Sequence, residues 1–212
     1  MKKTLLFFIG TTIVGACNNP SAPGMPEAAL SPLEGFVAIA PSDITENPFQ
    51  RIGDAFLITA GVDGDYNTMT ASWGSWGIFF NEPTTTCLLR ANRYTLEYIR
   101  RTKTYTLAFF DEQYHEQVVH FGMSSGRNSD KMKTHQLTAL VTPAGNIAYR
   151  EASLIIECEL IQLTTVHPDD FFRDDDKAFI VGGYEEARDY HKAVTGKITG
   201  VWAKAPSAAK QP

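Results

Sequence analysis

Two short polar segments carry residue types that bind a phosphate group. The first, "SSGRNSDK", places an arginine and a lysine beside two serines and a glycine whose backbone a ligand can approach closely. The second, "RANRYT", lies directly before an expected helix, where free amide groups attract anions. The alternative for each segment is a polar surface loop with ordinary arginines. The candidate phosphate ligands are Arg93, Thr95, Ser125, Gly126, Arg127 and Lys131.

A strand with small side chains precedes these segments. In "YNTMTASWGSWGIFF" (residues 66–80), a β-type alternation turns to alanine, serine and glycine around Trp73 and Trp76. Small side chains let a flat ligand lie against the backbone, and an indole can stack on the ligand or form a wall. A barrel bend with aromatic packing is the alternative. A planar ring together with a phosphate describes a mononucleotide cofactor, and FMN fits both features.

The sequence gives little support to metal or nucleophilic chemistry. His115 and His120 are five residues apart, so they do not share a helix face. The segment "DGDYN" begins like a calcium loop, but Thr68 stands where that loop needs glycine. No Gly-x-Ser-x-Gly elbow occurs. We therefore expect no metal, and we assign no catalytic side chain.

Composition indicates one soluble globular domain. The chain has 212 residues, of which 43% are apolar and 20% are charged. The net charge is -5 and no run of lysine and arginine occurs, which argues against a nucleic-acid partner. Cys87 and Cys158 lie in apolar, strand-like runs, and we expect buried thiols there, although export would also permit a disulfide.

The N-terminus has the pattern of an export signal. Two lysines precede a short apolar stretch that ends in "VGAC", and small residues before a cysteine resemble the bacterial lipobox. We expect a signal peptide at 1–16, with Cys17 lipidated as the only membrane anchor, so that the protein is exported. An ordinary signal peptide that happens to contain a cysteine is the alternative. Residues 17–30 read as a flexible tether, 31–205 as the domain and 206–212 as a disordered tail.

The pattern of elements predicts a mainly β domain. Asn47 and Pro48 are typical of a helix start, and Asp63-Gly64 of a hairpin turn. Six or seven strands with two or three short helices indicate a closed or nearly closed antiparallel barrel. We expect helices within 44–54, 94–103 and 111–123, and strands within 55–62, 66–80, 84–91, 104–110, 153–166, 177–190 and 197–204.

The order of these motifs points to a family. "NTMTASW", "RANRYTLEYI", "SGRNSDK" and "IIECEL" together resemble the flavin reductase-like domain, including flavoredoxin-type proteins, across 45–203. The resemblance implies an FMN-binding split β-barrel, usually a homodimer with the flavin near the subunit interface. It also implies that the segment at 67–73 lies along the flavin, while 93–95 and 125–131 hold phosphate and ring. The residues added to the site on this ground are Asn67, Met69, Thr70, Ala71, Ser72 and Trp73.

The resemblance implies an exported, flavin-dependent oxidoreductase that passes electrons through bound FMN. The alternative is a module that binds a flavin or nucleotide without turnover. Donor and acceptor stay open, because NADH and NADPH belong to the cytosol. Many family members carry a histidine before a late strand that ends in a Gly-Glu-Val-like segment. We match that region to "DDDKAFIVGGYEE", which puts Lys177 in the place of the histidine.

Overall fold

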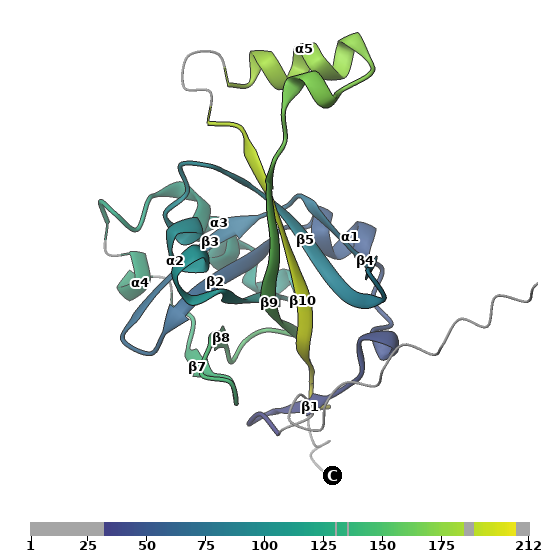
Figure 1. Ribbon diagram of the computed structural model, residues 1–212. Helices are drawn as coiled ribbons and strands as arrows, with labels where there is room; N and C mark the ends of the chain where they lie inside the picture. Colours follow the sequence, from purple (N-terminus) through teal and green to yellow (C-terminus); the bar gives the residue numbers. More distant parts are fainter. Residues whose placement is uncertain (1–31, 130, 135, 185–188, 207–212) are drawn as a thin grey trace, which may run out of the picture.

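A computed structural model describes residues 32–129, 131–134, 136–184 and 189–206 (Figure 1). The expected signal peptide (1–16) and the tether with Cys17 (17–30) lie outside these ranges, as does the expected tail apart from residue 206. In the ranges that are described, no helix combines the length and the apolar character needed to cross a membrane.

The described chain forms an antiparallel sheet with helices around it. Its strands are β1 (Phe36–Ala38), β2 (Phe56–Val62), β3 (Asp65–Ala71), β4 (Gly74–Phe79), β5 (Glu82–Arg90), β6 (Thr104–Phe109), β9 (Leu154–Thr165) and β10 (His191–Lys204). A separate two-stranded sheet consists of β7 (Ala139–Val141) and β8 (Ile147–Tyr149). Its α-helices are α1 (Pro48–Gly53), α2 (Tyr94–Thr102), α3 (His115–Met123), α4 (Lys131–Thr134) and α5 (Asp174–Gly182). Single 3-10 turns are η2 (Pro41–Asp43), η3 (Glu112–Tyr114) and η4 (Pro168–Asp170).

Local signals fix several of these elements. The Asn47 side chain accepts a 3.0 Å hydrogen bond from the amide of Phe49, and Pro48 occupies the first position of α1, as predicted. The Asp63-Gly64 turn joins β2 to β3, also as predicted. Helix α2 ends where Lys103 takes up a left-handed conformation with φ of 63°. Local capping and turn chemistry therefore account for the elements around the candidate site.

The sheet closes on itself through a very short link. Its strand order is β3-β2-β6-β9-β10-β5-β4, with β1 paired to β10, so β3 and β4 stand at opposite ends. Only Ser72 and Trp73 separate these two strands in the chain. The sheet must therefore curl until the end of β3 comes next to β5, where the Leu88 amide donates a 3.0 Å hydrogen bond to the Trp73 carbonyl, while β3 and β4 share no ladder in the described chain. The single strand expected over 66–80 is wrong, because the chain crosses between sheet edges at this link.

Both faces of the central strands are covered. Ile58 on β2 and Ile156 on β9 face the interior of the barrel, where they pack with Leu107. Their neighbours Leu57 and Ile155 face the opposite side and belong to a second buried cluster. A strand buried on both faces reads as a continuous apolar run, which explains why "LIIECEL" shows no alternation.

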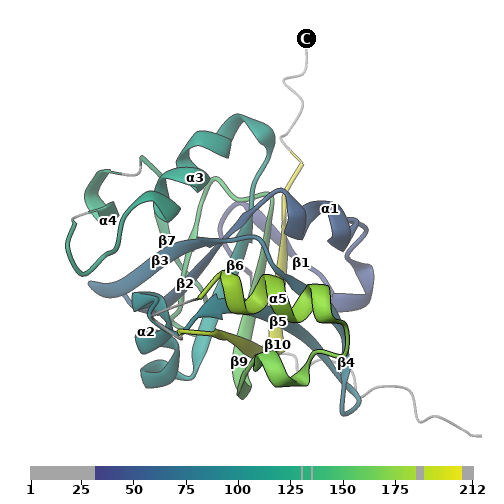
Figure 2. The same cartoon turned by 90° about the horizontal axis from the view of Figure 1, so that it is seen from above.

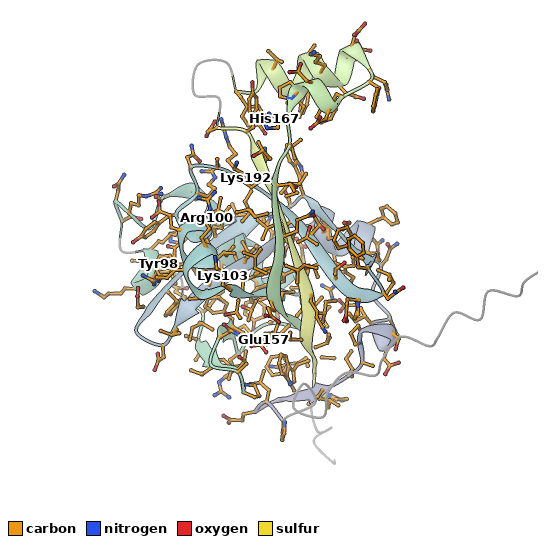
Figure 3. The ribbon with its side chains drawn as sticks, viewed as in Figure 1. Tyr98, Arg100, Lys103, Glu157, His167 and Lys192 are labelled. Carbon is orange, nitrogen blue, oxygen red and sulfur yellow. The ribbon has the colours of Figure 1, made fainter. Side chains whose placement is uncertain are left out.

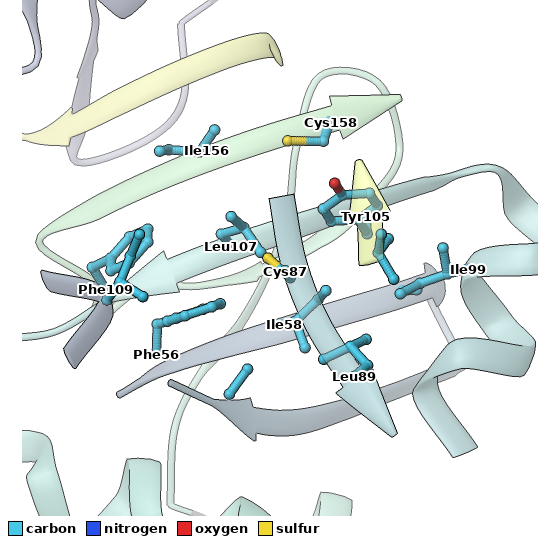
Figure 4. Packing of buried hydrophobic residues seen from close by; sticks show 14 of the residues in the cluster. Phe56, Ile58, Cys87, Leu89, Ile99, Tyr105, Leu107, Phe109, Ile156 and Cys158 are labelled. Atoms are coloured by element: carbon cyan, nitrogen blue, oxygen red, sulfur yellow. The ribbon is translucent and has the colours of Figure 1, made fainter. Parts of the chain in front are cut away.

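The two described cysteines are buried thiols without a bridge (Figure 4). Both lie inside the barrel, where Thr85 comes within 3.3 Å of the Cys158 sulfur. Burial raises the pKa of Cys87 well above its usual range and that of Cys158 to about 12. These cysteines therefore act as small core residues rather than as nucleophiles, which confirms the expectation of buried thiols.

A helix replaces the strand expected over 177–190. Strands β9 and β10 run beyond the barrel and carry a projecting segment, residues 166–184, which we name the α5 arm (Figures 1 and 2). Three aspartates, 174–176, occupy the first turn of α5, where carboxylates interact favourably with the helix dipole. The acidic run thus begins this helix. The late strand is β10, which starts at His191.

The closing link predicts unequal effects of two glycine substitutions on β4. A Cβ at Gly74 would lie 2.3 Å from the Thr86 carbonyl oxygen, whereas a Cβ at Gly77 meets nothing within 4 Å. Gly74→Ala should lower the free energy of unfolding by about 1–3 kcal/mol, which is the usual cost of overpacking. Gly77→Ala should be neutral or slightly stabilising. Denaturant unfolding of both variants measures this difference, and equal stability would show that β4 does not press on β5.

Candidate functional site

The predicted phosphate segments and strand β3 border one pocket of about 320 Å³. It lies between β3, the N-terminus of α2, the C-terminus of α3 and the loop at 124–131. Figure 1 shows these elements on the same side of the sheet. Nine of the twelve residues predicted from the sequence line this pocket: Asn67, Met69, Thr70, Arg93, Thr95, Ser125, Gly126, Arg127 and Lys131.

Buried Asn67 connects three of the walls. Its side-chain amide donates a 2.6 Å hydrogen bond to the Thr95 hydroxyl in the first turn of α2. On the loop, a Cβ at Gly126 would lie only 2.0 Å from the Asn67 Oδ1 atom. Glycine is thus needed here because the loop backbone passes directly against the Asn67 amide. The three predicted segments are held together by this contact.

Thr70 fixes the fourth wall. Its hydroxyl donates a 2.5 Å hydrogen bond to the Val118 carbonyl within α3. Gly122, one turn later, leaves room for the Thr70 side chain, since a Cβ there would lie 3.3 Å from it. Thr68 points away from the pocket and is hydrogen-bonded to the Tyr149 hydroxyl at 2.6 Å. Asn67, Met69 and Thr70 thus line the pocket, while Thr68 is tied to the core.

Arg93 is the cation whose charge is free for a ligand. It occupies the N-cap position of α2 but makes no side-chain hydrogen bond to the first helical amides. Its side chain is exposed, and in the described ranges it forms no ion pair with a carboxylate. An unpaired guanidinium beside uncapped helix amides is a favourable place for an anion.

Arg127 already has protein partners. Its guanidinium forms an ion pair with Glu97, donates a 2.8 Å hydrogen bond to the Asn92 carbonyl, and lies 4.8 Å from the centre of the Tyr94 ring. These contacts tie the loop to α2. Two of its five N–H donors make these polar contacts. The main role of Arg127 is therefore to hold the loop against α2 in the pocket wall.

Lys131 is buried in the wall of the pocket. Its ammonium group donates hydrogen bonds of 2.8 and 2.9 Å to the carbonyls of Phe121 and Ser124, at the C-terminal end of α3. Burial, and then the positive charge of Arg93, lower the pKa of Lys131 to about 8. Lys131 therefore neutralises the carbonyl end of the helix and adds positive charge that is lost in mild alkali.

Three predicted residues lie outside this pocket. Ala71 is 8% exposed and faces the core. Ser72 and Trp73 line a second, more apolar pocket of about 410 Å³ against α1 and β4. Trp73 also borders a third pocket, under the α5 arm. The run 67–73 thus extends from the first pocket across the closing link.

The match of Lys177 to the position before a late strand is wrong. Lys177 lies inside α5, where it pairs with Asp169 at 2.9 Å. The late strand is β10, and His191 is its first residue. Burial, then Arg90 and Arg93, lower the pKa of His191, so the imidazole is neutral at pH 7. A histidine therefore does stand at the start of the late strand.

Further lining residues were not singled out from the sequence. Four of them lie inside the two predicted phosphate segments, and the other two lie on α3, which the packing of α3 on β3 brings to the pocket. Across the described residues, no three histidine, cysteine or acidic side chains gather as a metal site. The additional lining residues are Asn92, Tyr94, Phe121, Gly122, Ser124 and Asn128.

Comparison with protein families gives a match over most of the chain. Residues 53–211 match the flavin reductase like domain. The chain belongs to this family. The resemblance of the motifs is thereby confirmed, and the family is one of flavin-related oxidoreductase domains. No curated protein sequence matches the chain.

Solved structures confirm the mainly β split-barrel fold. An FMN-binding domain of a flavin reductase-like enzyme from Shewanella baltica has 16% identity and a TM-score of 0.58, covering 82% of this chain and 80% of its own. An FMN-binding protein from Thermus thermophilus has 18% identity and a TM-score of 0.56, covering 78% and 76%. The flavoredoxin of Desulfovibrio vulgaris (Miyazaki F) has 20% identity and a TM-score of 0.53, covering 70% and 68%.

Proposed function

We propose that this protein is a flavin-dependent oxidoreductase that holds FMN in the pocket beside β3. One observation supports this above all: residues from three separate sequence motifs converge on a single pocket. Asn67, Thr95 and Gly126 interlock at its base, so the pocket is formed by the protein itself rather than by a ligand. Family membership agrees with this chemistry.

The residues present fit the two parts of FMN. Arg93, the amides at the start of α2 and the positive charge of Lys131 suit a phosphate. Met69 and Thr70 bring the end of β3 to the pocket, where a ring can lie beside the strand. Strand β3 is the first strand in the sheet order, so in the described chain its outer edge faces no further strand and can hydrogen-bond a ring. Bound FMN would supply electron transfer through its ring.

The second candidate is a module that binds the flavin without turnover. His191 distinguishes the two, because it places the histidine of the family pattern at the start of β10, close enough to Arg93 to respond to its charge. The direct test is the colour of the purified protein and its response to reductants. A yellow protein that NADH, NADPH or a reduced electron carrier bleaches is an oxidoreductase. A yellow protein that none of these reduces is a binding module.

Arg93→Ala should separate FMN from riboflavin, because only FMN carries a phosphate. Loss of one charge-assisted hydrogen bond weakens binding by roughly ten- to a hundredfold. Arg127→Ala should have a smaller effect, since Arg127 is already paired with Glu97. The measurement is titration of flavin-free protein with FMN and with riboflavin, followed by quenching of flavin fluorescence.

Arg100 on α2 is the matched control (Figure 3). It is exposed and does not line the pocket, so Arg100→Ala should leave the ratio of the two affinities unchanged. The preference of the wild type for FMN should also shrink as pH rises through about 8, because Lys131 loses its proton there while the phosphate stays doubly charged. The phosphate placement is wrong if Arg93→Ala and Arg100→Ala behave alike.

We infer that the protein forms a homodimer through β4 and α1. Strand β4 is the last strand in the sheet order, and it presents Ile78, which is exposed, as are Phe80 just after the strand and Phe49 on the neighbouring α1. Phe49 and Trp76 also line the second, apolar pocket, which joins α1 to β4. Three exposed apolar side chains beside an unpaired strand are stabilised when another protein surface buries them.

Ile78→Glu should shift the protein from dimer to monomer, because it would place a charge in the apolar contact. Sedimentation equilibrium of the domain without residues 1–30 measures the change. Val62→Glu is the control, since Val62 is 51% exposed but ends β2, in the strand next to β3 at the other end of the sheet order. A monomeric wild type, or equal effects of the two variants, would contradict this interface.

We also propose that the protein is exported and anchored by a lipid on Cys17. The motif Val14-Gly15-Ala16-Cys17 after a short apolar stretch supports this. Cys17→Ser should release the protein from the membrane fraction and remove the mass of the acyl chains. If the wild type carries no acyl mass and fractionates as the variant does, the anchor is ruled out.

A further inference from the structure

The α5 arm presents apolar side chains to solvent. None of the residues of α5 is buried, and Phe179 and Val181 on this helix are exposed. Phe172, just before the helix, is fully exposed. Figure 1 shows the arm projecting from the barrel, carried by the ends of β9 and β10. Large apolar side chains on one projecting segment indicate a surface that another protein surface covers.

The second pocket has walls that suit such a side chain. This pocket of about 410 Å³ lies between α1 and the start of β4. Its volume is near the lower end for ligand pockets, so it is large enough for one aromatic side chain. Among the described residues, no charged side chain lines it, so an entering phenyl ring would leave no charge without a partner. Its large apolar lining residues are Pro48, Phe49, Ile52, Trp73 and Trp76.

The second pocket lies between the arm and the proposed dimer contact. Trp73 lines the second pocket and also the third pocket, whose other walls include residues of the arm. Phe49 lines the second pocket and is one of the three exposed side chains of the contact through β4 and α1. The pocket therefore continues the dimer contact towards the arm.

The contact through β4 and α1 is small by itself. Its exposed side chains Ile78, Phe80 and Phe49 would bury on the order of 500 Å² on each protomer. A stable interface buries about 800 Å² on each partner. Phe172 and Phe179 would add on the order of 300 Å². Contact with the arm would thus bring the interface to the size that a stable dimer needs.

Charge decides which surface of a second copy the arm can meet. Residues 166–184 contain five aspartates and only two basic residues, Arg173 and Lys177, so the arm carries a net negative charge. Two such arms repel each other, which disfavours pairing of arm with arm about a two-fold axis. The uncharged second pocket has no such penalty. Two-fold symmetry then brings each arm to the pocket of the other copy.

We propose that the arm of each protomer crosses to its partner and inserts Phe172 into the partner's second pocket. This inference rests on the homodimer proposed above and names the segment that completes its interface. The Phe172 ring packs there among aromatic side chains, as buried anchors of interfaces do. The aspartates of the arm lie at the polar rim, where they stay solvated.

The test is a cross-link between two different copies of the chain. Both copies carry Cys17→Ser, which leaves only Cys87 and Cys158, and these are buried. One copy also carries Phe172→Cys and the other Phe49→Cys, and the two are co-expressed with different tags. A short bis-maleimide links cysteines that lie close together, and peptide mass spectrometry identifies the linked residues. We expect a link between residues 172 and 49, which can form only between copies.

Two control pairs locate the contact. In the first, Val62→Cys replaces Phe49→Cys, because Val62 is exposed but ends β2 at the other end of the sheet order. In the second, both copies carry Phe172→Cys, which reports whether the two arms meet each other. Both control pairs should give few covalent dimers.

Phe172→Ala should raise the dissociation constant of the dimer about ten- to a hundredfold, as expected for loss of an aromatic anchor from an interface pocket. The fold of the protomer should be unaffected, because Phe172 is fully exposed in it. Met123→Ala is the matched control, since Met123 is exposed on α3 and lines neither surface of the proposed contact. Sedimentation equilibrium at several protein concentrations measures both variants against the wild type.

Three results would each overturn the inference: a dimer without a link between residues 172 and 49, efficient links between two arms, or equal effects of Phe172→Ala and Met123→Ala. Failure of the homodimer looks different, because the wild type would then sediment as a monomer at every concentration. Flavin binding is measured separately by fluorescence titration. Failure of the proposed FMN site would therefore not be mistaken for failure of the arm contact.

Discussion

The short link between β3 and β4 is the constraint on which the two pockets beside Trp73 depend. Two residues, Ser72 and Trp73, must carry the chain from one end of the sheet order to the other. That is possible only if the sheet closes, and closure presses Gly74 against the Thr86 carbonyl. Small residues after β3 therefore serve the contact between strands. Trp73, at the point of closure, is left to form walls for pockets on the surface of the barrel.

Positive charge in the flavin pocket has two separate tasks. Arg127 and Lys131 satisfy Glu97, backbone carbonyls and the end of α3, so they build the wall. Arg93 has no such partner in the described chain and remains free for a ligand. Although the net charge of the chain is -5, three cationic side chains lie at this pocket. They make the electrostatic potential in the pocket more positive without making the whole protein basic. A phosphate there meets charges already fixed by hydrogen bonds, which lowers the cost of ordering them.

The sequence predicts elements whose signals are local, and it fails where distant pairing decides. The Asn47 cap, the Asp63-Gly64 turn and the motif residues are short-range features, and the structure places them as expected. Residues 66–80 alternate in the same way whether they form one strand or two. Only the position of β3 and β4 at opposite ends of the sheet order shows that there are two strands. The apolar run "KAFIV" has the composition of a strand. In the structure β9 pairs directly with β10, so no strand from this run lies between them. The same error matched Lys177 to the residue before the late strand, whereas His191 begins that strand.

The α5 arm shows how an added segment can extend such a barrel. Helix α5 has nine residues and none of them is buried, and a helix of that length is not stable by itself in water. Aspartates in its first turn help, but they contribute only fractions of a kcal/mol each. The position of the arm must therefore come from Tyr184, which is buried against Arg90 and His191. The contact that holds the arm also joins it to His191, the first residue of β10. Tyr184 and His191 both line the pocket beneath the arm, so that pocket depends on the same contact.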